Sequence, residues 1–329
     1  MKLEELGEFG LIGRIADRIT PSAGIRIGIG DDAAAVAPDP DTVSLLTTDM
    51  LLEGVHFDLS FCTPENLGWK SLAVNLSDIA AMGGKPRYCL LSLAVPRGVP
   101  VSFIDGFIAG LLACAAEFGV TLIGGDTCSS RSGLVVSLTV MGEQRPERVV
   151  PRSGARPGDL IVVTGTIGDS ALGLRQLMAG HRDGRAILRH LKPSPRVREG
   201  LALAEEKLPT AMIDISDGLL ADLGHILKRS AVGAHLELAR LPLSPEVAAH
   251  VAGEAEDPYQ LPLSGGEDYE LLFTIPPDRE AAARKALSPF GTTVSVLGTI
   301  TTSGLGVVDR NGKDYPVIAR GYNHFSPVH

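Results

Sequence analysis

Hydrophobic side chains recur along this chain with a helical spacing in some stretches and form short continuous runs in others. Over residues 3–19, 64–82 and 101–118, apolar residues return every three or four positions, as they do on the buried face of an amphipathic helix. Runs of β-branched and apolar residues, which are typical of strands, fill further stretches of the first half of the chain, at residues 43–48, 88–95, 120–123 and 134–141.

A polar, proline- and glycine-rich stretch over residues 143–157 has no apolar periodicity and predicts a domain boundary. We therefore expect an N-terminal domain over residues 1–147 and a C-terminal α/β domain over residues 148–329. Because strands and helices mix without strict alternation, the predicted fold class is α+β rather than a doubly wound sheet. In the second domain we expect strands near residues 160–164, 211–215, 234–239, 270–275 and 293–299, and helices near 169–179, 195–207, 218–229 and 278–288.

Length and charge narrow the class of protein. The chain has 329 residues, which at about 150 residues per domain agrees with two domains. Its 30 lysine and arginine residues against 39 aspartate and glutamate residues give a net charge of −9, which argues against a nucleic-acid partner bound by bulk electrostatics. No run of about 18 apolar residues and no signal-like apolar core occurs, so we expect no membrane partner. The four cysteines form no CxxC pair, which predicts reduced, mostly buried thiols and a cytoplasmic location.

Two common phosphate- and dinucleotide-binding motifs are absent. The chain has no P-loop, and Gly28-Ile29-Gly30 continues into Asp31-Asp32 instead of completing a dinucleotide-binding fingerprint. The chain carries instead a series of acidic and hydroxyl residues that follow glycines or stand at the ends of predicted elements, namely Asp31 and Asp32, Thr47, Thr48 and Asp49, Asn75 and Asp78, Asp126, and Asp214 and Asp217.

Carboxylate and hydroxyl oxygens are ligands that suit Mg²⁺, an ion that is usually shared with substrate phosphates. Each aspartate taken singly is better explained as a turn former or a helix N-cap. Several carboxylates that converge would, however, repel one another strongly in the absence of a cation. The series as a whole therefore predicts a magnesium site, if the fold brings its members together.

Three further polar residues have both a functional and a structural interpretation. Ser216 precedes an amphipathic helix whose first N–H groups can bind phosphate oxygens, but helix capping would explain the serine equally well. Glu267 lies in a glycine-turned acidic loop, where it either holds an amine or a ring nitrogen of a substrate or stands in an exposed hairpin turn. His56 is flanked by apolar residues, and a lone histidine of this kind is more often structural.

Taken together, these segments resemble the thiamine-monophosphate kinase family, within the superfamily that includes aminoimidazole ribonucleotide synthetase and selenophosphate synthetase. The resemblance runs in order along nearly the whole chain. The acidic turns recur across the superfamily, whereas three segments are typical of the thiamine-phosphate member: Gly54-Val55-His56-Phe57, the SGGEDYEL segment over residues 264–271, and Gly321-Tyr322-Asn323-His324-Phe325.

The resemblance implies that ATP and thiamine monophosphate give thiamine diphosphate and ADP, with several Mg²⁺ ions. It also implies a homodimer whose N-terminal sheets pair, and a C-terminal domain that completes the active site. Asp49 and Asp126 are the implied catalytic residues. The implied ATP contacts are Gly125, Asp126, Arg152 and Ser216, and the implied thiamine phosphate contacts are His56, Glu267 and Tyr322. The implied metal ligands are Asp32, Thr47, Thr48, Asp49, Asp78, Asp126, Asp214 and Asp217.

A phosphate monoester is already deprotonated near neutral pH, so its attack on the γ-phosphate of ATP needs alignment and charge neutralisation rather than a general base. We therefore expect direct in-line transfer without a phosphoenzyme. Tyr322 stands where relatives often carry tryptophan, and it is expected to stack on the cationic thiazolium.

Three alternatives are weighed against this hypothesis. A sister ATP-dependent synthetase would share the acidic turns, but a selenophosphate synthetase would carry a reactive cysteine in an N-terminal glycine-rich segment, whereas the first cysteine here is Cys62. A catalytically silent protein that binds nucleotide or thiamine phosphate would lack some aspartate ligands, and every expected position is filled. A purely structural oligomerisation module would leave the repeated Gly-Asp turns without a reason.

Overall fold

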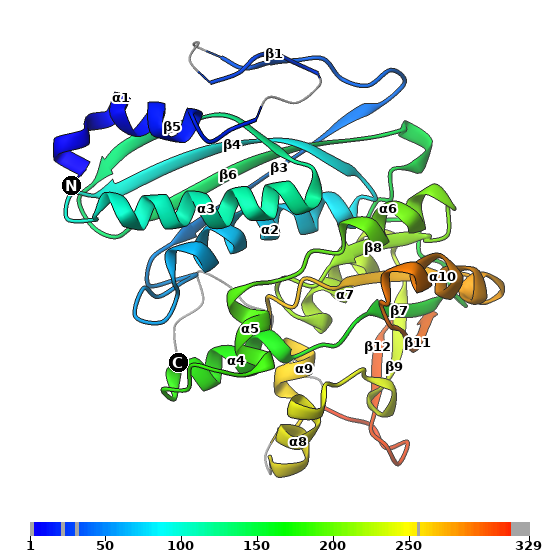
Figure 1. Cartoon of the computed structure of the whole chain (residues 1–329). Coiled ribbons are helices and arrows are strands. Elements are labelled where there is room, and N and C mark those ends of the chain that lie inside the picture. The colour runs from blue at the N-terminus through cyan, green and yellow to red at the C-terminus, as the bar shows by residue number, and fades with distance from the viewer. Residues whose placement is uncertain (1–2, 21–23, 30–32, 255–256, 317–329) are drawn as a thin grey trace. The chain divides into compact units, whose positions relative to one another are not determined.

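The computed structural model describes residues 3–20, 24–29, 33–254 and 257–316, and the chain divides into two compact units (Figure 1). Unit 1 comprises Met1–Ile79 and Gly84–Glu147, and unit 2 comprises Ala80–Gly83 and Arg148–His329. Both units combine helices with a largely antiparallel sheet, so the α+β class expected from the sequence is confirmed.

Unit 1 is built on a four-stranded sheet of order β3-β6-β4-β5. β3 (Val43–Leu52) pairs antiparallel with β6 (Val135–Gln144), and β6 pairs antiparallel with β4 (Lys85–Pro96). β4 pairs parallel with β5 (Thr121–Ser130), and α3 (Val101–Phe118) supplies the crossover that a parallel pair needs. β3 and β5 are therefore the two edge strands of this sheet.

Helices cover the two faces of this sheet differently. α2 (Pro64–Ala81) and α3 lie along one face, whereas α1 (Leu3–Ala16) and the small hairpin of β1 (Ile25–Ile27) and β2 (Ala35–Val36) lie on the other side (Figure 1). A Cβ on Gly68 of α2 would collide with the carbonyl oxygen of Phe107 on α3, so the two helices pack at a distance that only glycine allows.

α3 is, among the described helices, the one whose length and composition would let it cross a membrane. Half of that stretch is buried within unit 1, as in the core helix of a folded domain, so the feature is weak evidence for a membrane span. Its Asp105 also forms a two-point ion pair with Arg14 of α1, at distances of 2.5 and 2.6 Å.

Unit 2 contains a six-stranded sheet of order β12-β9-β11-β7-β10-β8, antiparallel except for the β12–β9 pair. Its strands are β7 (Leu160–Thr164), β8 (Ala211–Asp214), β9 (Gly233–Glu237), β10 (Leu271–Ile275), β11 (Val294–Thr301) and β12 (Leu305–Val308). Its helices are α4 (Asp169–Met178), α5 (Arg185–Leu191), α6 (Val197–Glu205), α7 (Leu219–Ser230), α8 (Pro245–Gly253), α9 (Gln260–Ser264) and α10 (Glu280–Leu287). Both β10 and β8 are buried along their whole length, although β8 is the last strand in this order.

Two strands of unit 1 extend further than expected from the sequence. β3 continues to Leu52 and β5 continues to Ser130, because each keeps its backbone pairing with a neighbouring strand beyond the apolar run. The polar residues Thr47 to Asp49 and Gly124 to Thr127 therefore lie inside strands, and the prediction that they close strands was wrong. In unit 2, α5 was not predicted, because its seven residues are too few to establish a helical period.

Candidate active site

Three of the expected metal ligands meet on one face of the sheet in unit 1. Side chains alternate along β3, which directs Thr47 and Asp49 to the same face. Thr47 Oγ1 donates a hydrogen bond to the carboxylate of Asp78 on α2. Burial, together with the negative charge of Asp78, raises the pKa of Asp49 to about 7. Crowded hard oxygen donors of this kind suit Mg²⁺, so these residues fit the metal that the sequence predicts.

Thr48 points away from this group. Its hydroxyl donates a hydrogen bond to the carbonyl oxygen of Leu138 (2.9 Å) and lies 3.2 Å from the hydroxyl of Thr139, both on β6. The alternation of the strand separates Thr48 from Thr47 and Asp49, which local sequence order alone does not reveal.

Asp126 and Gly125 lie on β5, at the edge of the sheet opposite to β3. Asp126 is exposed and pairs in register with Ser92 of β4. A Cβ on Gly125 would collide with the carbonyl oxygen of Leu91, so glycine is needed for the two strands to approach here. Within one chain, the structure does not bring Asp126 together with Asp49.

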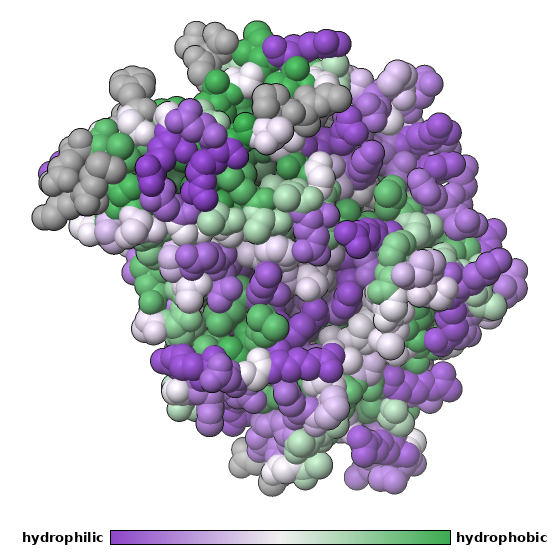
Figure 2. Space-filling model, viewed as in Figure 1, coloured by the Kyte–Doolittle hydropathy of each residue, from purple (hydrophilic) through white to green (hydrophobic). Residues whose placement is uncertain are grey.

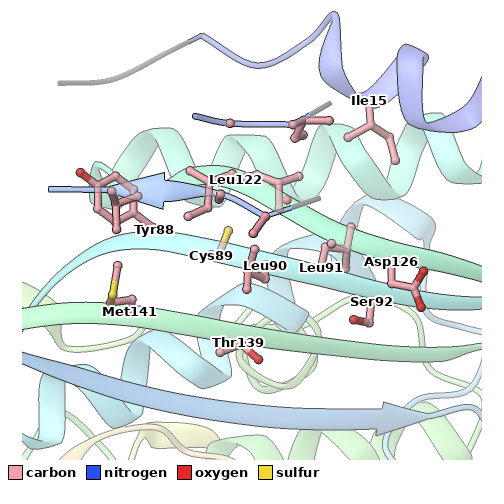
Figure 3. A pocket seen from close by; sticks show the side chains of 18 of the residues that line it. Ile15, Tyr88, Cys89, Leu90, Leu91, Ser92, Leu122, Asp126, Thr139 and Met141 are labelled. Carbon is pink, nitrogen blue, oxygen red and sulfur yellow. The ribbon is translucent and has the colours of Figure 1, made fainter. Parts of the chain in front are cut away.

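A cavity of about 1040 Å³ lies on the side of the sheet that faces α1, and Asp126 and Ser92 stand at one end of it (Figure 3). Its walls are mainly apolar and include Ile15 of α1 and Leu122 of β5. Large hydrophobic side chains of the sheet are also exposed, with Leu46 at 70% and Met50 at 56%. Hydrophobic residues are visible at the surface around α1 and β1 (Figure 2). Several exposed apolar side chains near an apolar cavity commonly mark an interaction site.

His56 follows β3 in a tight turn of unit 1 and is half-buried. Its Nδ1 accepts a hydrogen bond from the backbone N–H of Leu52 at 3.1 Å. Because Nδ1 is the acceptor, the neutral ring carries its proton on Nε2. The ring can therefore donate a hydrogen bond from Nε2.

In unit 2 the backbone brings Ser216 and Glu267 side by side. Asp214 ends β8 and is buried, and the chain beyond it stays paired with the segment that leads into β10. The N–H of Glu267 donates to the carbonyl oxygen of Ser216 at 2.8 Å, and the N–H of Tyr269 donates to that of Ile215 at 2.9 Å. The two residues expected to contact the two different substrates are thus neighbours in this unit.

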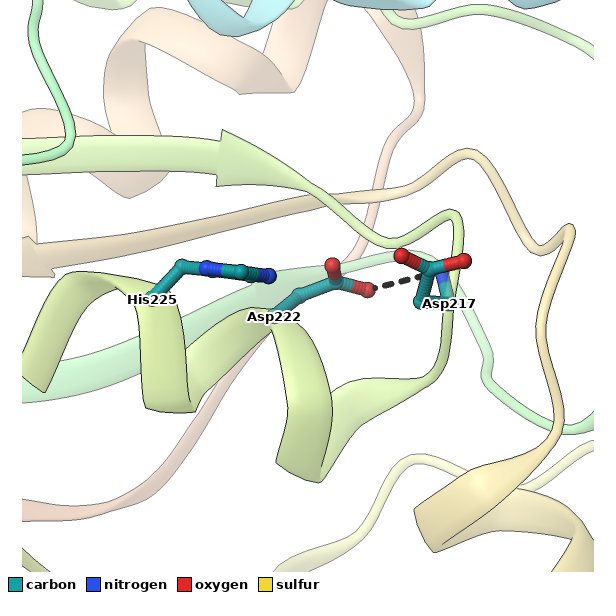
Figure 4. A group of neighbouring side chains, drawn as sticks. All are labelled: Asp217, Asp222 and His225. Atoms are coloured by element: carbon teal, nitrogen blue, oxygen red, sulfur yellow. Dashed lines mark hydrogen bonds between the residues drawn. The ribbon is translucent and has the colours of Figure 1, made fainter. Parts of the chain in front are cut away.

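The start of α7 differs from what its sequence suggests. One carboxylate oxygen of Asp222 accepts the backbone N–H groups of Ser216, Asp217 and Gly218, each at 3.1 Å (Figure 4). These three N–H groups, which precede the first helical residue Leu219, are therefore occupied by a side chain of the helix itself. Ser216 is not the helix cap, because Gly218 takes that position. The capping interpretation of Ser216 was therefore wrong.

Asp222 is a candidate residue that sequence analysis missed. Burial raises its pKa to about 7, against the opposing effect of the three N–H groups that it accepts. Possible ligand atoms of Asp217, Asp222 and His225 lie within 4.8 Å of one another, so Asp217 has two potential co-ligands. An acidic residue in the first turn of a helix was the available signal, but such residues are common at helix starts.

Three predicted site residues do not belong to any of the groups described above. Arg152 is exposed, in the segment just after the start of unit 2. Asp32 and Tyr322 lie outside the residues that the structure describes.

Both halves of the chain match models of one protein family. Residues 30–144 match the N-terminal domain, and residues 156–310 the C-terminal domain, of AIR synthase related proteins. The chain is 42% identical over 330 residues to the thiamine-monophosphate kinase of Escherichia coli (strain K12), covering 97% of this chain and 98% of that protein. It is 34% identical over 329 residues to that of Bacillus subtilis (strain 168), covering 97% and 100%. The chain therefore belongs to the thiamine-monophosphate kinase family.

Solved structures agree with this assignment. Thiamine-monophosphate kinase from Stenotrophomonas maltophilia K279a superposes with a TM-score of 0.83 at 37% identity, covering 94% of this chain and 98% of that one. The structure of AaThiL complexed with AMPPCP and TMP has a TM-score of 0.76 at 37% identity and covers 99% of both chains. The hydrogenase maturation protein HypE of E. coli, at 17% identity and a TM-score of 0.78, shares the fold.

Proposed function

We propose that this protein transfers the γ-phosphoryl group of ATP to thiamine monophosphate, which gives thiamine diphosphate and ADP. The observation that carries the proposal is the near full-length identity to thiamine-monophosphate kinases. A structure that covers 99% of this chain, that of AaThiL, was obtained as a complex with AMPPCP and TMP, which supports the same pair of substrates here. The reaction is the last step in the synthesis of thiamine diphosphate.

The acidic and hydroxyl residues described above would hold Mg²⁺. Bound there, the cations would neutralise charge on the phosphate groups of both substrates. Asp49 and Asp78 supply closely spaced carboxylates for this role, and their crowding supports it. The proposed ligands are Asp32, Thr47, Asp49, Asp78 and Asp126 of unit 1, and Asp214 and Asp217 of unit 2. Thr48, whose hydroxyl lies on the other face of β3, would serve a different ion from Thr47 and Asp49.

The remaining site residues would bind and orient the two substrates. Gly125, Arg152 and Ser216 would contact ATP. His56 would donate a hydrogen bond from Nε2 to thiamine phosphate, in keeping with its Nδ1 acceptor contact. Glu267 would face the cationic acceptor, and Tyr322 would stack on it.

No general base is needed for this transfer. The attacking phosphate oxygen is already ionised near neutral pH, so the protein has to align it with the γ-phosphate and exclude water. We propose direct in-line transfer without a phosphoenzyme. Stable labelling of the protein by γ-labelled ATP in the absence of acceptor would contradict it.

We also propose a homodimer in which the sheets of unit 1 pair. The exposed Leu46 and Met50 support such a contact. The separation of Asp49 and Asp126 on the two edge strands also supports a dimer, because pairing of two copies can bring β5 of one protomer to β3 of its partner.

We further propose a cytoplasmic location. The four cysteines are free thiols, which suits a reducing compartment.

The function is tested with purified protein, ATP, Mg²⁺ and thiamine monophosphate. Thiamine diphosphate is followed by chromatography after oxidation to its fluorescent thiochrome form. We expect product that depends on Mg²⁺, and none from free thiamine. Intact ATP binding without any product would favour a sister synthetase or a catalytically silent binding protein.

A further inference from the structure

The loop that carries Glu267 has an unusual backbone conformation. Glu267 has φ 66° and Tyr269 has φ 50°, so two non-glycine residues lie in the left-handed region with a single residue between them. Each such residue costs roughly 1 kcal/mol or more, and the conformation persists only where the surroundings hold it. Contacts from outside the loop must therefore determine where Glu267 stands.

Those contacts come from α4 and α5. The buried carboxylate of Asp268 accepts the N–H of Gly168 at 2.6 Å and that of Ser170 at 3.2 Å, at the start of α4. Arg189 of α5 donates from Nη2 to the carbonyl oxygen of Asp268 at 3.1 Å and to the carboxylate of Glu270 at 2.6 Å. The backbone of the loop is thus anchored on both sides of Tyr269, and the side chain of Glu267 has a separate contact.

That contact is His190, the neighbour of Arg189 on α5. The imidazole is only 4% exposed, and its Nδ1 lies 3.2 Å from Oε2 of Glu267 and 3.0 Å from Oγ of the buried Ser170. Glu267 itself is 27% exposed, so its carboxylate stands between the protein interior and solvent. An ionised carboxylate accepts hydrogen bonds only, so Nδ1 has to carry a proton to face it favourably.

We propose that His190 is a positioning residue that holds the carboxylate of Glu267, through its Nδ1–H, in the orientation that binds the cationic ring system of the phosphate acceptor. The inference rests on the proposed function, in which Glu267 contacts thiamine monophosphate. With its proton on Nδ1, the imidazole shares this N–H between Oε2 of Glu267 and Oγ of Ser170, which then accepts as well. His190 does not touch either substrate in this arrangement and acts through Glu267.

The kinetic test compares His190→Leu with His190→Asn. Loss of a charge-assisted hydrogen bond to Glu267 should raise the KM for thiamine monophosphate about tenfold in His190→Leu, while kcat and the KM for ATP change less than about twofold. The amide of asparagine can place a donor near the position of Nδ1, so His190→Asn should restore most of the lost affinity. His181→Leu, at an exposed histidine of the same unit, is the matched control and should leave all three constants unchanged.

A double mutant separates positioning from a general structural role. In a Glu267→Gln background, adding His190→Leu should change the KM for thiamine monophosphate by less than about twofold, because the effect passes through one carboxylate. Full additivity of the two substitutions would overturn the inference. So would an equal loss of affinity for both substrates, or a fall in kcat that His190→Asn does not rescue.

The contact between His190 and Glu267 can also be tested without substrate, by measuring the protonation of the His190 ring. The ring ¹⁵N spectrum of the wild-type protein, with the signals of His190 assigned by their absence in His190→Asn, should show a proton on Nδ1. An unprotonated Nδ1 would overturn the inference even if His190→Leu failed to fold. Absence of thiamine monophosphate turnover in the wild type, with Nδ1–H present, would instead overturn the proposed function and the named acceptor.

Discussion

Acidic residues are withdrawn from solvent in both units, half-buried at Asp49 and Asp78 and fully buried at Glu270, but they meet different partners. In unit 1, Asp49 lies beside Asp78, and burial and that neighbouring charge raise its pKa to about 7. In unit 2, the fully buried Glu270 accepts hydrogen bonds from Arg189, Arg196 and Thr164, at 2.5 to 2.7 Å. The first arrangement becomes favourable when a cation binds, whereas the second already contains its cations. Burial of a carboxylate therefore does not by itself indicate an ion site, because Glu270 is more deeply buried than Asp49 and is held by two arginines.

The strongest test of this contrast is Asp49→Asn. Loss of one charge from the metal-binding group should lower kcat roughly a thousandfold, because positioned charge supplies much of the stabilisation of the transition state. The protein should stay folded, since the substitution also removes a buried carboxylate that repels Asp78. Steady-state kinetics at saturating Mg²⁺ and circular dichroism check both parts. Near-normal turnover would contradict the metal assignment.

Asp126→Asn should be as damaging, and mixing the two inactive variants tests the proposed dimer. If Asp49 acts with Asp126 of the partner subunit, a mixed dimer keeps one intact site. Random reassembly after mild unfolding should then restore about a quarter of the wild-type activity. The control is each variant reassembled alone, which should remain inactive. A mixture without activity would place both residues in the same protomer's site.

Glu270→Gln should affect stability rather than turnover. It leaves the half-buried Arg189 and Arg196 without their shared carboxylate, which should lower the free energy of unfolding of unit 2 by about 3 kcal/mol. The matched control is Glu280→Gln, which breaks an exposed ion pair with Arg284 and should cost only about 0.3–0.5 kcal/mol. Urea unfolding measures both values. Similar midpoints for the two variants would show that the buried network is not structural.

A smaller effect is expected from Asp268, because burial raises its pKa to about 7. The folded protein then binds a proton that the unfolded chain releases near its ordinary pKa of 3.8. The contribution of Asp268 to stability should therefore decrease as the pH rises from about 4 to about 7, and level off above that. Urea unfolding at several pH values should show a smaller slope for Asp268→Asn. An unchanged slope would indicate that the two N–H groups of Gly168 and Ser170, which donate to its carboxylate, keep Asp268 ionised.

Local sequence patterns predicted the regular elements well where a segment pairs or packs along its whole apolar face. α3 was expected over residues 101–118 and occupies Val101–Phe118. The patterns failed where pairing continues beyond the apolar run, as in β5, which carries Asp126 inside a strand. They also failed for Asp222, because its role depends on how the turn after β8 folds back onto the helix.

The sequence by itself determined the family, the α+β class and the acidic residues that suit Mg²⁺, because these depend on residue type and on periods of a few positions. The tertiary structure alone decided which of these residues meet. It placed Thr47 and Asp49 beside Asp78 but Thr48 on the other face, and it set Asp126 at the far edge of the sheet. The contact of His190 with Glu267 likewise joins segments that are far apart along the chain. Such contacts arise from the packing of whole helices and strands, and no local pattern of residues encodes them.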